Sequence, residues 1–324
     1  MKSFTFSILV FNHEEWILEH LESIKYLVLK YKPPIVDLLI SDDKSIDRSR
    51  KLVDCWLVSN GHLFRNIEKI YNEVNVGTVI CTKNIIKKCE TDLLKITAGD
   101  DVYSFENIFH YSNMFCRSSI VSGLPYYLKD SNLTNETFSN VLHITSSLIY
   151  RDYNRFDMLH ATNAPNILYN VGQLREIIDS SLFDRVKLVE DLLIQVLLSS
   201  RKFSFTQLYI PLVYYRRTSG SSYLIKGSQF DFDQRAIMDF QIYKSSCFKK
   251  LFLRNKYFCF GIKNKSVKYL VNIPFYIFLI KSILKFPKII KKLSYFNKYN
   301  DISIHKRHYS LIAKAANIYE NSID

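Results

Sequence analysis

The most constraining feature of this sequence is the alternation of short apolar runs with amphipathic segments over its first hundred residues. This alternation predicts an α/β fold with a mostly parallel central sheet and helices on both of its faces. We expect Asn12 to cap the first helix, Glu15 to complete a capping box, and Pro33 to end the helix. The expected strands and helices cover residues 4–11, 17–28, 35–40, 47–59, 67–71, 79–88 and 93–97.

The patterns in the middle of the chain are weaker. Residues 120–128 fit a strand, 182–200 fit a helix, and 203–215 alternate as a strand does. After this point the composition changes to Lys, Phe, Tyr and Ile. We therefore expect two regions, an α/β domain over residues 1–222 and a basic, mainly helical region over 223–324.

Three acidic pairs lie at the ends of these segments. Taken alone, each pair is explained by helix capping, because carboxylates are favoured at helix N-termini. Taken together, the first two pairs follow strands of one parallel sheet, at the edge where such sheets bind ligands. Like charges gathered there need a cation or a proton, and Mg²⁺ and Mn²⁺ often bridge carboxylates to substrate phosphates. The pairs are Asp42-Asp43, Asp100-Asp101 and Glu190-Asp191.

Six segments, in order along the chain, resemble motifs of the family 2 glycosyltransferases. Residues 6–12 are similar to the family's opening strand, and Ser-Asp-Asp-Lys-Ser-Ile-Asp at 41–47 resembles its acidic D-D-G-S-x-D loop. Asn-Val-Gly at 75–77 with Lys-Asn at 83–84 resembles the family's N-x-G…R-N segment, and Ala-Gly-Asp-Asp at 98–101 resembles its D-x-D-D metal motif. Glu-Asp at 190–191 resembles its E-D pair, and residues 211–221 resemble the segment that closes its catalytic domain.

The resemblance covers residues 3–222 and implies the nucleotide-diphospho-sugar transferase fold, with a basic helical extension behind it. Two departures stand out. Ala98 replaces the usual first Asp of the metal motif, which leaves Asp100 as the expected metal ligand. Lys44 replaces the usual Gly of the acidic loop, which alters the turn.

The resemblance also implies roles for the matched residues. Asp191 would be the general base, assisted by Glu190 at the acceptor. Asp100, helped by Asp101, would hold Mn²⁺ or Mg²⁺ and so offset charge on the departing diphosphate. Residues implied to bind the nucleotide sugar, which we expect to be a UDP-sugar, are Phe11, Asn12, Asp42, Asp43, Asn75, Gly77, Lys83, Asn84, Arg216 and Arg217.

The reaction implied is a metal-dependent, inverting transfer of a hexose to a hydroxyl acceptor. By analogy with the family, it would serve bacterial surface polysaccharide assembly of the O-antigen or capsule type. For Arg216 and Arg217 a solvated strand end remains an equal alternative. His13, His110, His143 and His160 show no ligand spacing, and we expect them to be ordinary surface or core residues.

The net charge of +13 is concentrated near the C-terminus. Residues 244–307 contain 16 Lys and Arg but one acid, Asp301, whereas the remainder is close to neutral. Residues 269–280 carry no charge but are too few to span a bilayer, which takes about twenty apolar residues. Apolar residues continue to position 293 between lysines, a pattern typical of a segment lying in the bilayer interface. The expected partners are therefore a membrane surface and a glycan or lipid-linked acceptor, not nucleic acid. A helical subdomain with solvated lysines explains the same pattern.

We expect a cytoplasmic protein, peripheral on the inner face of the cell membrane. Charged residues from Glu14 onward leave no leader of the signal-peptide type, and the six cysteines include no C-x-x-C pair of a zinc site. The alternative is a non-enzymatic basic protein that binds membranes or nucleic acid. Such a protein has no need of three acidic pairs at strand ends.

Overall fold

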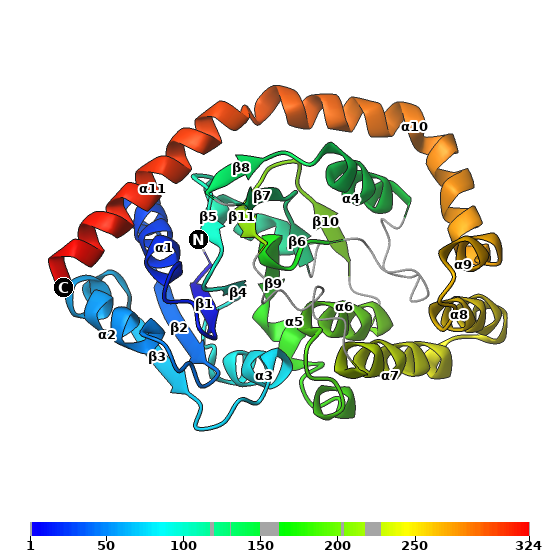
Figure 1. Cartoon of the computed structure of the whole chain (residues 1–324), viewed down its shortest axis with the longest axis horizontal. Helices are drawn as coiled ribbons and strands as arrows, with labels where there is room; N and C mark the ends of the chain where they lie inside the picture. The colour runs from blue at the N-terminus through cyan, green and yellow to red at the C-terminus, as the bar shows by residue number, and fades with distance from the viewer. Residues whose placement is uncertain are drawn as a thin grey trace.

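The structure is a computed structural model that describes residues 2–116, 120–129, 131–149, 162–201, 204–217 and 228–323. At its centre lies a seven-stranded sheet with the order β10-β6-β9-β4-β1-β2-β3 (Figure 1). Strands β4, β1, β2 and β3 are mutually parallel, and β9 is antiparallel to both of its neighbours. The strands are β1 (Phe4–Val10), β2 (Val36–Asp42), β3 (Asn66–Tyr71), β4 (Leu93–Ala98), β6 (Ile120–Ser122), β9 (Ile167–Asn170) and β10 (Phe205–Gln207).

Successive strand residues feed two hydrophobic cores, one on each face of this sheet. Leu38 and Ile40 join a core with α1 and α2, whereas Leu39 joins a core with α3, α5 and α6. This division follows from the period of two along a strand. The predicted α/β class with helices on both faces is confirmed. The helices are α1 (Ile17–Tyr31), α2 (Ser49–Asn60), α3 (Thr78–Lys88), α5 (Val171–Arg175) and α6 (Glu190–Ser200).

The predicted start of the first helix is wrong. Helix α1 begins at Ile17 after Trp16, and no side chain caps it. Asn12 instead has a left-handed backbone with φ 56°, and its Oδ1 accepts a hydrogen bond from the Ile46 amide at 2.9 Å. The side chain of Asn12 therefore ties the end of β1 to the acidic loop after β2, and is not available to the helix.

Residues 120–128 were expected to form one strand, and this prediction is also wrong. They contribute β6 to the large sheet and part of β7 (Tyr126–Lys129) to a second sheet. The chain turns between them at Gly123 and Pro125. The Gly123 amide donates to the Asn166 carbonyl, and proline has no amide with which to continue the ladder.

The segments expected over 182–200 and 203–215 are each divided in two. A short 3₁₀ turn, η4 (Ser181–Asp184), precedes α6. Between them the Asp233 carboxylate accepts the amides of Lys187 and Leu188, at 3.0 and 2.7 Å, so these amides do not continue a helix. Strand β10 is separated from β11 (Val213–Arg216) by a turn that contains Pro211.

A second, four-stranded sheet has the order β5-β11-β7-β8 and includes β5 (Val102–Tyr103) and β8 (Asn132–Thr134). The buried Asn166, which precedes β9 of the large sheet, joins the two sheets. Its Oδ1 accepts the amides of Leu212 and Val213, both at 2.9 Å, and its Nδ2 donates to the Val213 carbonyl at 3.0 Å.

The C-terminal region is helical, as predicted, and wraps around the α/β core (Figure 1). Helix α10 packs on α4 (Thr137–Ile149), and α11 packs along α1. The Tyr214 hydroxyl and His305 Nδ1 of α11 are hydrogen bonded at 2.8 Å in a buried setting. The helices are α7 (Ser228–Lys244), α8 (Cys247–Phe260), α9 (Lys265–Leu270), α10 (Ile273–Tyr299) and α11 (Ile302–Ile323).

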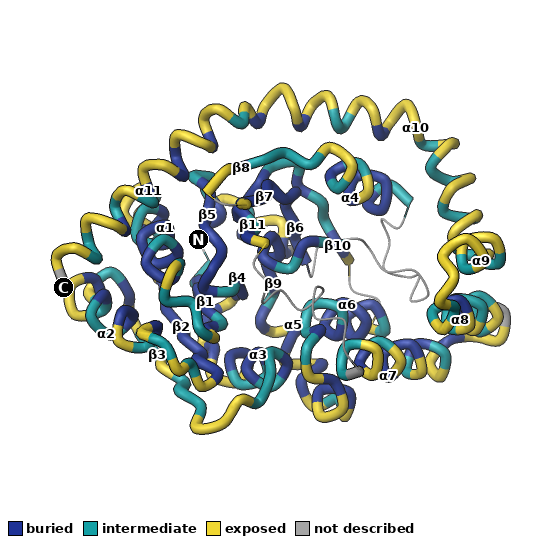
Figure 2. Tube along the Cα trace, viewed as in Figure 1, coloured by how far each residue is buried: buried dark blue, intermediate teal, exposed yellow. Residues whose placement is uncertain are grey.

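The predicted boundary near residue 222 lies outside the described residues, so the division into 1–222 and 223–324 stays a prediction. Most of α10 is exposed along its length (Figure 2). Among the described residues, no helix is long and apolar enough to cross a membrane.

We predict that Asn166→Ala lowers the free energy of unfolding by about 3 kcal/mol, because it leaves two buried amides unpaired at a cost of about 1–3 kcal/mol each. Urea unfolding followed by circular dichroism measures this loss. Asn66→Ala, at an exposed position of the edge strand β3, is the matched control and should change stability by less than about 0.5 kcal/mol. Equal losses in the two variants would exclude the bridging role of Asn166.

Candidate active site

A cavity of about 530 Å³ lies at the carboxyl ends of β1, β2 and β4. The loop after each strand contributes to its wall, as the rule for parallel sheets predicts. The structure thus brings acids from all three pairs of the sequence to one cavity, although the pairs are far apart in the chain. The predicted site residues in its wall are Phe11, Asn12, Asp43, Asn75, Gly77, Asp100, Asp101, Glu190 and Asp191.

The carboxylate of Asp43 organises the loop that precedes α3. Its Oδ1 accepts the Val76 amide at 2.7 Å, and its Oδ2 accepts the Gly77 amide at 2.8 Å. The Asn75 side chain donates to the Asp43 carbonyl at 3.3 Å. Asp43 therefore shapes the cavity wall through the backbone of residues 75–77.

Gly77 is required where this loop meets the segment before α6. Its φ is +86°, and a Cβ there would lie 2.9 Å from the Lys187 carbonyl oxygen. The next two residues reinforce the contact, because Thr78 Oγ1 donates to the Leu188 carbonyl at 3.1 Å and the Val79 amide to Lys187 at 3.1 Å. The loop held by Asp43 is thus joined directly to the chain that carries Glu190.

The two acids after β4 have different surroundings. Asp101 is buried, its Oδ1 accepts the Arg216 amide at 3.0 Å, and burial together with the Asp100 charge raises its pKa well above the ordinary value. The Arg216 guanidinium donates to the Asp100 carbonyl at 2.7 Å and pairs with Glu19. Both acids line the cavity, and Asp101 also supports strand β11.

His13 lies in the cavity wall, although its spacing in the sequence gave no sign of a role. Its Nδ1 is buried without a hydrogen-bond partner among the described residues, and a Cβ on Gly99 would lie 2.9 Å from this atom. Burial lowers the pKa of His13, although the Asp100 charge opposes the shift. The imidazole is therefore neutral at physiological pH.

A divalent cation fits this arrangement only with help from a substrate. Among the described residues, no group of three or more His, Cys, Asp and Glu side chains is placed to hold a metal ion by itself. Asp100 offers a carboxylate in the wall, and Mg²⁺ is commonly held by one or two carboxylates plus substrate phosphates. The donor set thus suits a cation that binds with a diphosphate.

Glu190 and Asp191 form the first turn of α6 and face the same cavity. Burial, reinforced by the charge of Asp191, raises the pKa of Glu190 to about 7. Burial also raises the pKa of Asp191, while its Oδ1 accepts the Leu192 amide at 2.7 Å. Two adjacent carboxyl groups that hold a proton near neutral pH are suited to general base chemistry.

Five predicted binding residues lie outside the cavity wall: Asp42, Lys83, Asn84, Arg216 and Arg217. Asp42 accepts Arg50 Nε at 2.6 Å and the Ser45 amide at 2.9 Å, so it braces the acidic loop. Lys83 pairs with Asp184 at 2.7 Å, and the Arg217 guanidinium pairs with Glu136 at 2.6 Å.

Besides His13, sequence reasoning missed Trp16, Thr78 and Cys81 in the wall. A signal for the first two was present, because Trp16 follows β1 in the same loop as Asn12, and Thr78 adjoins Gly77. Lys44 in the acidic loop has a left-handed φ of 69°, a backbone conformation that is uncommon for residues other than glycine.

Comparison with known proteins supports the fold. No protein-family model matches the chain, and no curated protein matches its sequence. Solved structures do match. S. aureus TarS in complex with UDP is 15% identical, with 82% of this chain and 73% of that chain covered and a TM-score of 0.54. TarS in complex with UDP-GlcNAc is 13% identical, with 91% and 80% covered and a TM-score of 0.53.

The mannosyltransferase PcManGT from Pyrobaculum calidifontis, in complex with GDP-Man and Mn²⁺, is 11% identical. The match covers 98% of this chain and 86% of that chain, with a TM-score of 0.53. At these identities the likeness shows a shared fold, with a mostly parallel sheet and helices around it.

We predict that Glu190→Gln raises the melting temperature by roughly 2–6 °C at pH 8 and leaves it nearly unchanged at pH 5. The native pKa of Glu190, about 7, exceeds its ordinary value of 4.5, so the native state holds a proton that the unfolded state has lost between these limits. Stability therefore falls as pH rises from 4.5 to 7, and glutamine removes that loss. Calorimetry at both pH values, with Glu90→Gln at an exposed site as control, measures the difference. The same shift at both pH values would contradict a raised pKa.

Proposed function

We propose that this chain is an inverting glycosyltransferase that moves a sugar from a nucleotide-diphospho-sugar to a hydroxyl group of an acceptor. One observation carries the proposal: Asp43, Asp100 and the Glu190-Asp191 pair meet around a single cavity at the strand ends. The nucleotide and nucleotide sugars bound to TarS and PcManGT, which share the fold, support a nucleotide-sugar donor. A UDP-sugar is the donor that we propose.

The donor would occupy the side of the cavity formed by β1 and β2. Phe11 is 47% exposed at this edge and offers a ring face to a nucleobase, next to the Asn75–Gly77 loop that Asp43 holds. Asp100 would hold Mn²⁺ or Mg²⁺, which when bound supplies positive charge to the leaving diphosphate. Asp101 and Arg216 would keep Asp100 in position through the contacts described above.

The acceptor would occupy the side formed by α6. Asp191 would accept the proton of the acceptor hydroxyl while the oxygen of that hydroxyl bonds to the anomeric carbon of the donor sugar. The bond from that carbon to the diphosphate breaks as the new bond forms, and the nucleoside diphosphate leaves. Attack from the opposite face inverts the anomeric configuration. Glu190, whose pKa burial and the charge of Asp191 raise to about 7, would orient the acceptor.

We predict that Asp191→Asn lowers the transfer rate by roughly 10²–10⁴-fold, the usual contribution of a general base. The dissociation constant for the donor should change less than about threefold, because the base acts on the acceptor. Product formation from a panel of nucleotide sugars with Mn²⁺, together with titration calorimetry, measures both quantities. Asp231→Asn, at an exposed position of α7, is the control.

Unchanged turnover in Asp191→Asn would remove this residue from the base role. If the unaltered chain neither binds nor turns over any donor in the panel, the non-enzymatic alternative is favoured, and binding to vesicles or nucleic acid then decides between its two forms.

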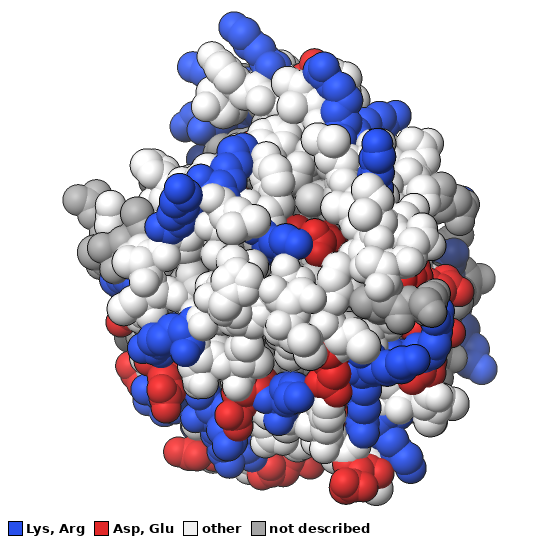
Figure 3. All heavy atoms as spheres, turned by 90° about the vertical axis from the view of Figure 1, so that its left-hand side faces the viewer, with Lys and Arg blue, Asp and Glu red and all other residues white. Residues whose placement is uncertain are grey.

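We further propose that the protein works at the inner face of the cell membrane, on a glycan or lipid-linked acceptor of surface polysaccharide assembly. At the top of the molecule, where the C-terminal helices lie, Lys and Arg have few acidic neighbours, whereas in the lower half they are mixed with most of the acidic side chains (Figure 3). Lysines near an anionic bilayer contribute about 1 kcal/mol each. Exposed apolar side chains of α10 beside them are Ile273, Leu279, Ile280, Ile283, Leu284, Phe286 and Ile290.

We predict that the variant Leu284→Ser/Phe286→Ser/Lys288→Glu/Lys291→Glu loses at least tenfold in binding to vesicles with anionic lipid, because both apolar insertion and charge attraction are removed. Sedimentation with anionic and neutral vesicles measures the partition. Lys51→Glu/Lys87→Glu, on exposed positions of α2 and α3, is the control. Equal binding of the two variants to anionic vesicles would show that α10 does not contact the membrane and is a solvated helix.

A further inference from the structure

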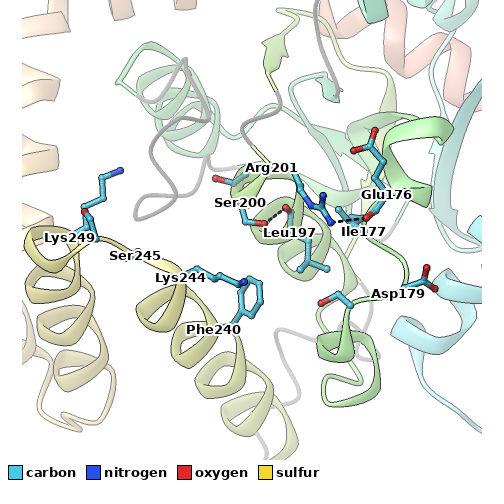
Figure 4. A pocket seen from close by; sticks show the side chains of 13 residues that line it. Glu176, Ile177, Asp179, Leu197, Ser200, Arg201, Phe240, Lys244, Ser245 and Lys249 are labelled. Carbon is cyan, nitrogen blue, oxygen red and sulfur yellow. Dashed lines mark hydrogen bonds between the residues drawn. The ribbon is translucent and has the colours of Figure 1, made fainter.

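The C-terminal region faces the α/β core on several sides. On one side, the corner between α7 and α8 lies across a cavity of about 680 Å³ from the end of α6, and its lining residues differ from those of the candidate active site (Figure 4). On another side, α11 packs along α1, the helix that follows the cavity-lining loop of Phe11 and Asn12 (Figure 1). Side chains of this second contact reach the acids after β4.

Arg216 of β11 connects α1 to the two acids after β4. Its Nε donates to the Asp100 carbonyl at 2.7 Å, and its amide donates to Asp101 Oδ1 at 3.0 Å. Its Nη2 donates to Oε2 of Glu19, which lies in the first turn of α1. The guanidinium also lies 5.9 Å from the ring centroid of Trp16, a residue of the cavity wall. Arg216 is buried, so these contacts fix its side chain between Glu19 and the backbone of Asp100.

The positive charge of Arg216 would oppose a cation at Asp100 if nothing offset it, because like charges repel. Burial lowers the pKa of Arg216, but Glu19, Tyr309 and Asp100 together raise it, so the guanidinium interacts with both carboxylates. Charges in such a partly buried setting are screened by salt less than those on an open surface. The Glu19 carboxylate therefore offsets a positive charge right beside the position where Asp100 would hold a metal ion.

Tyr309 of α11 holds Glu19 from the other side. Its hydroxyl donates to Glu19 Oε1 at 3.3 Å, while Arg216 binds Oε2, and its ring centroid lies 6.0 Å from the Arg216 guanidinium. Burial raises the pKa of Glu19, and Arg216 and Tyr309 oppose that shift, so both partners favour its charged form. Tyr309 is itself buried and packs with Tyr214 of the second sheet in one hydrophobic core. The position of Glu19 therefore depends on the packing of α11.

We propose that Glu19 and Tyr309 are positioning residues for the divalent cation at Asp100, so that α11 of the C-terminal region is required for full metal affinity. This inference rests on the proposed function, because the cation binds together with the diphosphate of the donor. The path runs from the Tyr309 hydroxyl to the Glu19 carboxylate, and from there through the Arg216 guanidinium to the backbone of Asp100. Glu19 holds the guanidinium in place and offsets its charge next to the cation.

Two tyrosines of α11 allow a matched test. Tyr309→Phe removes the bond to Glu19, and Tyr319→Phe removes a bond of the same kind, from the Tyr319 hydroxyl to the Cys55 carbonyl of α2 at 2.8 Å, outside the cavity wall. Electron paramagnetic resonance of free Mn²⁺, titrated with the full chain in saturating UDP, gives the affinity for the metal. We expect Tyr309→Phe to weaken it roughly threefold or more and Glu19→Gln roughly tenfold, since partners behind a metal ligand commonly contribute this much. Tyr319→Phe should match the unaltered chain.

The affinity for UDP without metal, measured by titration calorimetry, should be the same in all four proteins, which separates loss of the cation from general loss of structure. Equal Mn²⁺ affinity of the unaltered chain, Tyr309→Phe and Glu19→Gln would overturn this inference and leave the proposed function in place. Equal weakening by Tyr309→Phe and Tyr319→Phe would also overturn it, because the cause would then be a general loosening of α11. An unaltered chain that binds no Mn²⁺ with UDP would overturn both the inference and the proposed metal-dependent transfer.

Discussion

The structure depends on how clustered carboxylates are kept together at the end of a parallel sheet. Like charges in such a cluster repel one another, but specific donors bind three of the carboxylates. Arg50 donates to Asp42, and the amides of Val76 and Gly77 donate to Asp43. The amide of Arg216 donates to Asp101. These hydrogen bonds and the ion pair offset the repulsion between the carboxylates and hold them in the cavity wall. Asp43 and Asp101 line the cavity together with the carboxyl groups of Asp100, Glu190 and Asp191, for which these donors are not the partners.

The same bonds couple parts of the site that are distant in sequence. Asp43 holds the loop before α3, Gly77 allows that loop to touch the Lys187 carbonyl, and the chain then continues into Glu190. On the other side, Arg216 of the second sheet holds Asp101 and the backbone of Asp100. The proposed donor and acceptor sides are therefore connected by hydrogen bonds. A substitution in the loop before α3 should change the geometry of the acceptor side, and one in the segment before α6 should change that of the donor side.

The sequence predicted the sheet well because its signals there are local. Strands β1 to β4 and the helices between them follow from apolar periodicity alone, and the strand-end rule then brings Asp43 and Asp100 together. The errors come from tertiary contacts that no local pattern records. Asn12 bonds to Ile46 across 34 positions in place of capping α1, and Gly123 donates to Asn166 where one strand was expected. The cavity position of His13 depends on Gly99, which lies 86 residues away in the chain.

The central claim is that the cavity at the strand ends receives the diphosphate of a nucleotide sugar. A crystal structure of the protein with UDP and Mn²⁺ tests it most directly. The account predicts electron density for the nucleotide beside Phe11 and the Asn75–Gly77 loop, with the diphosphate next to Asp100. Nucleotide bound elsewhere on the molecule, with this cavity empty, would contradict it.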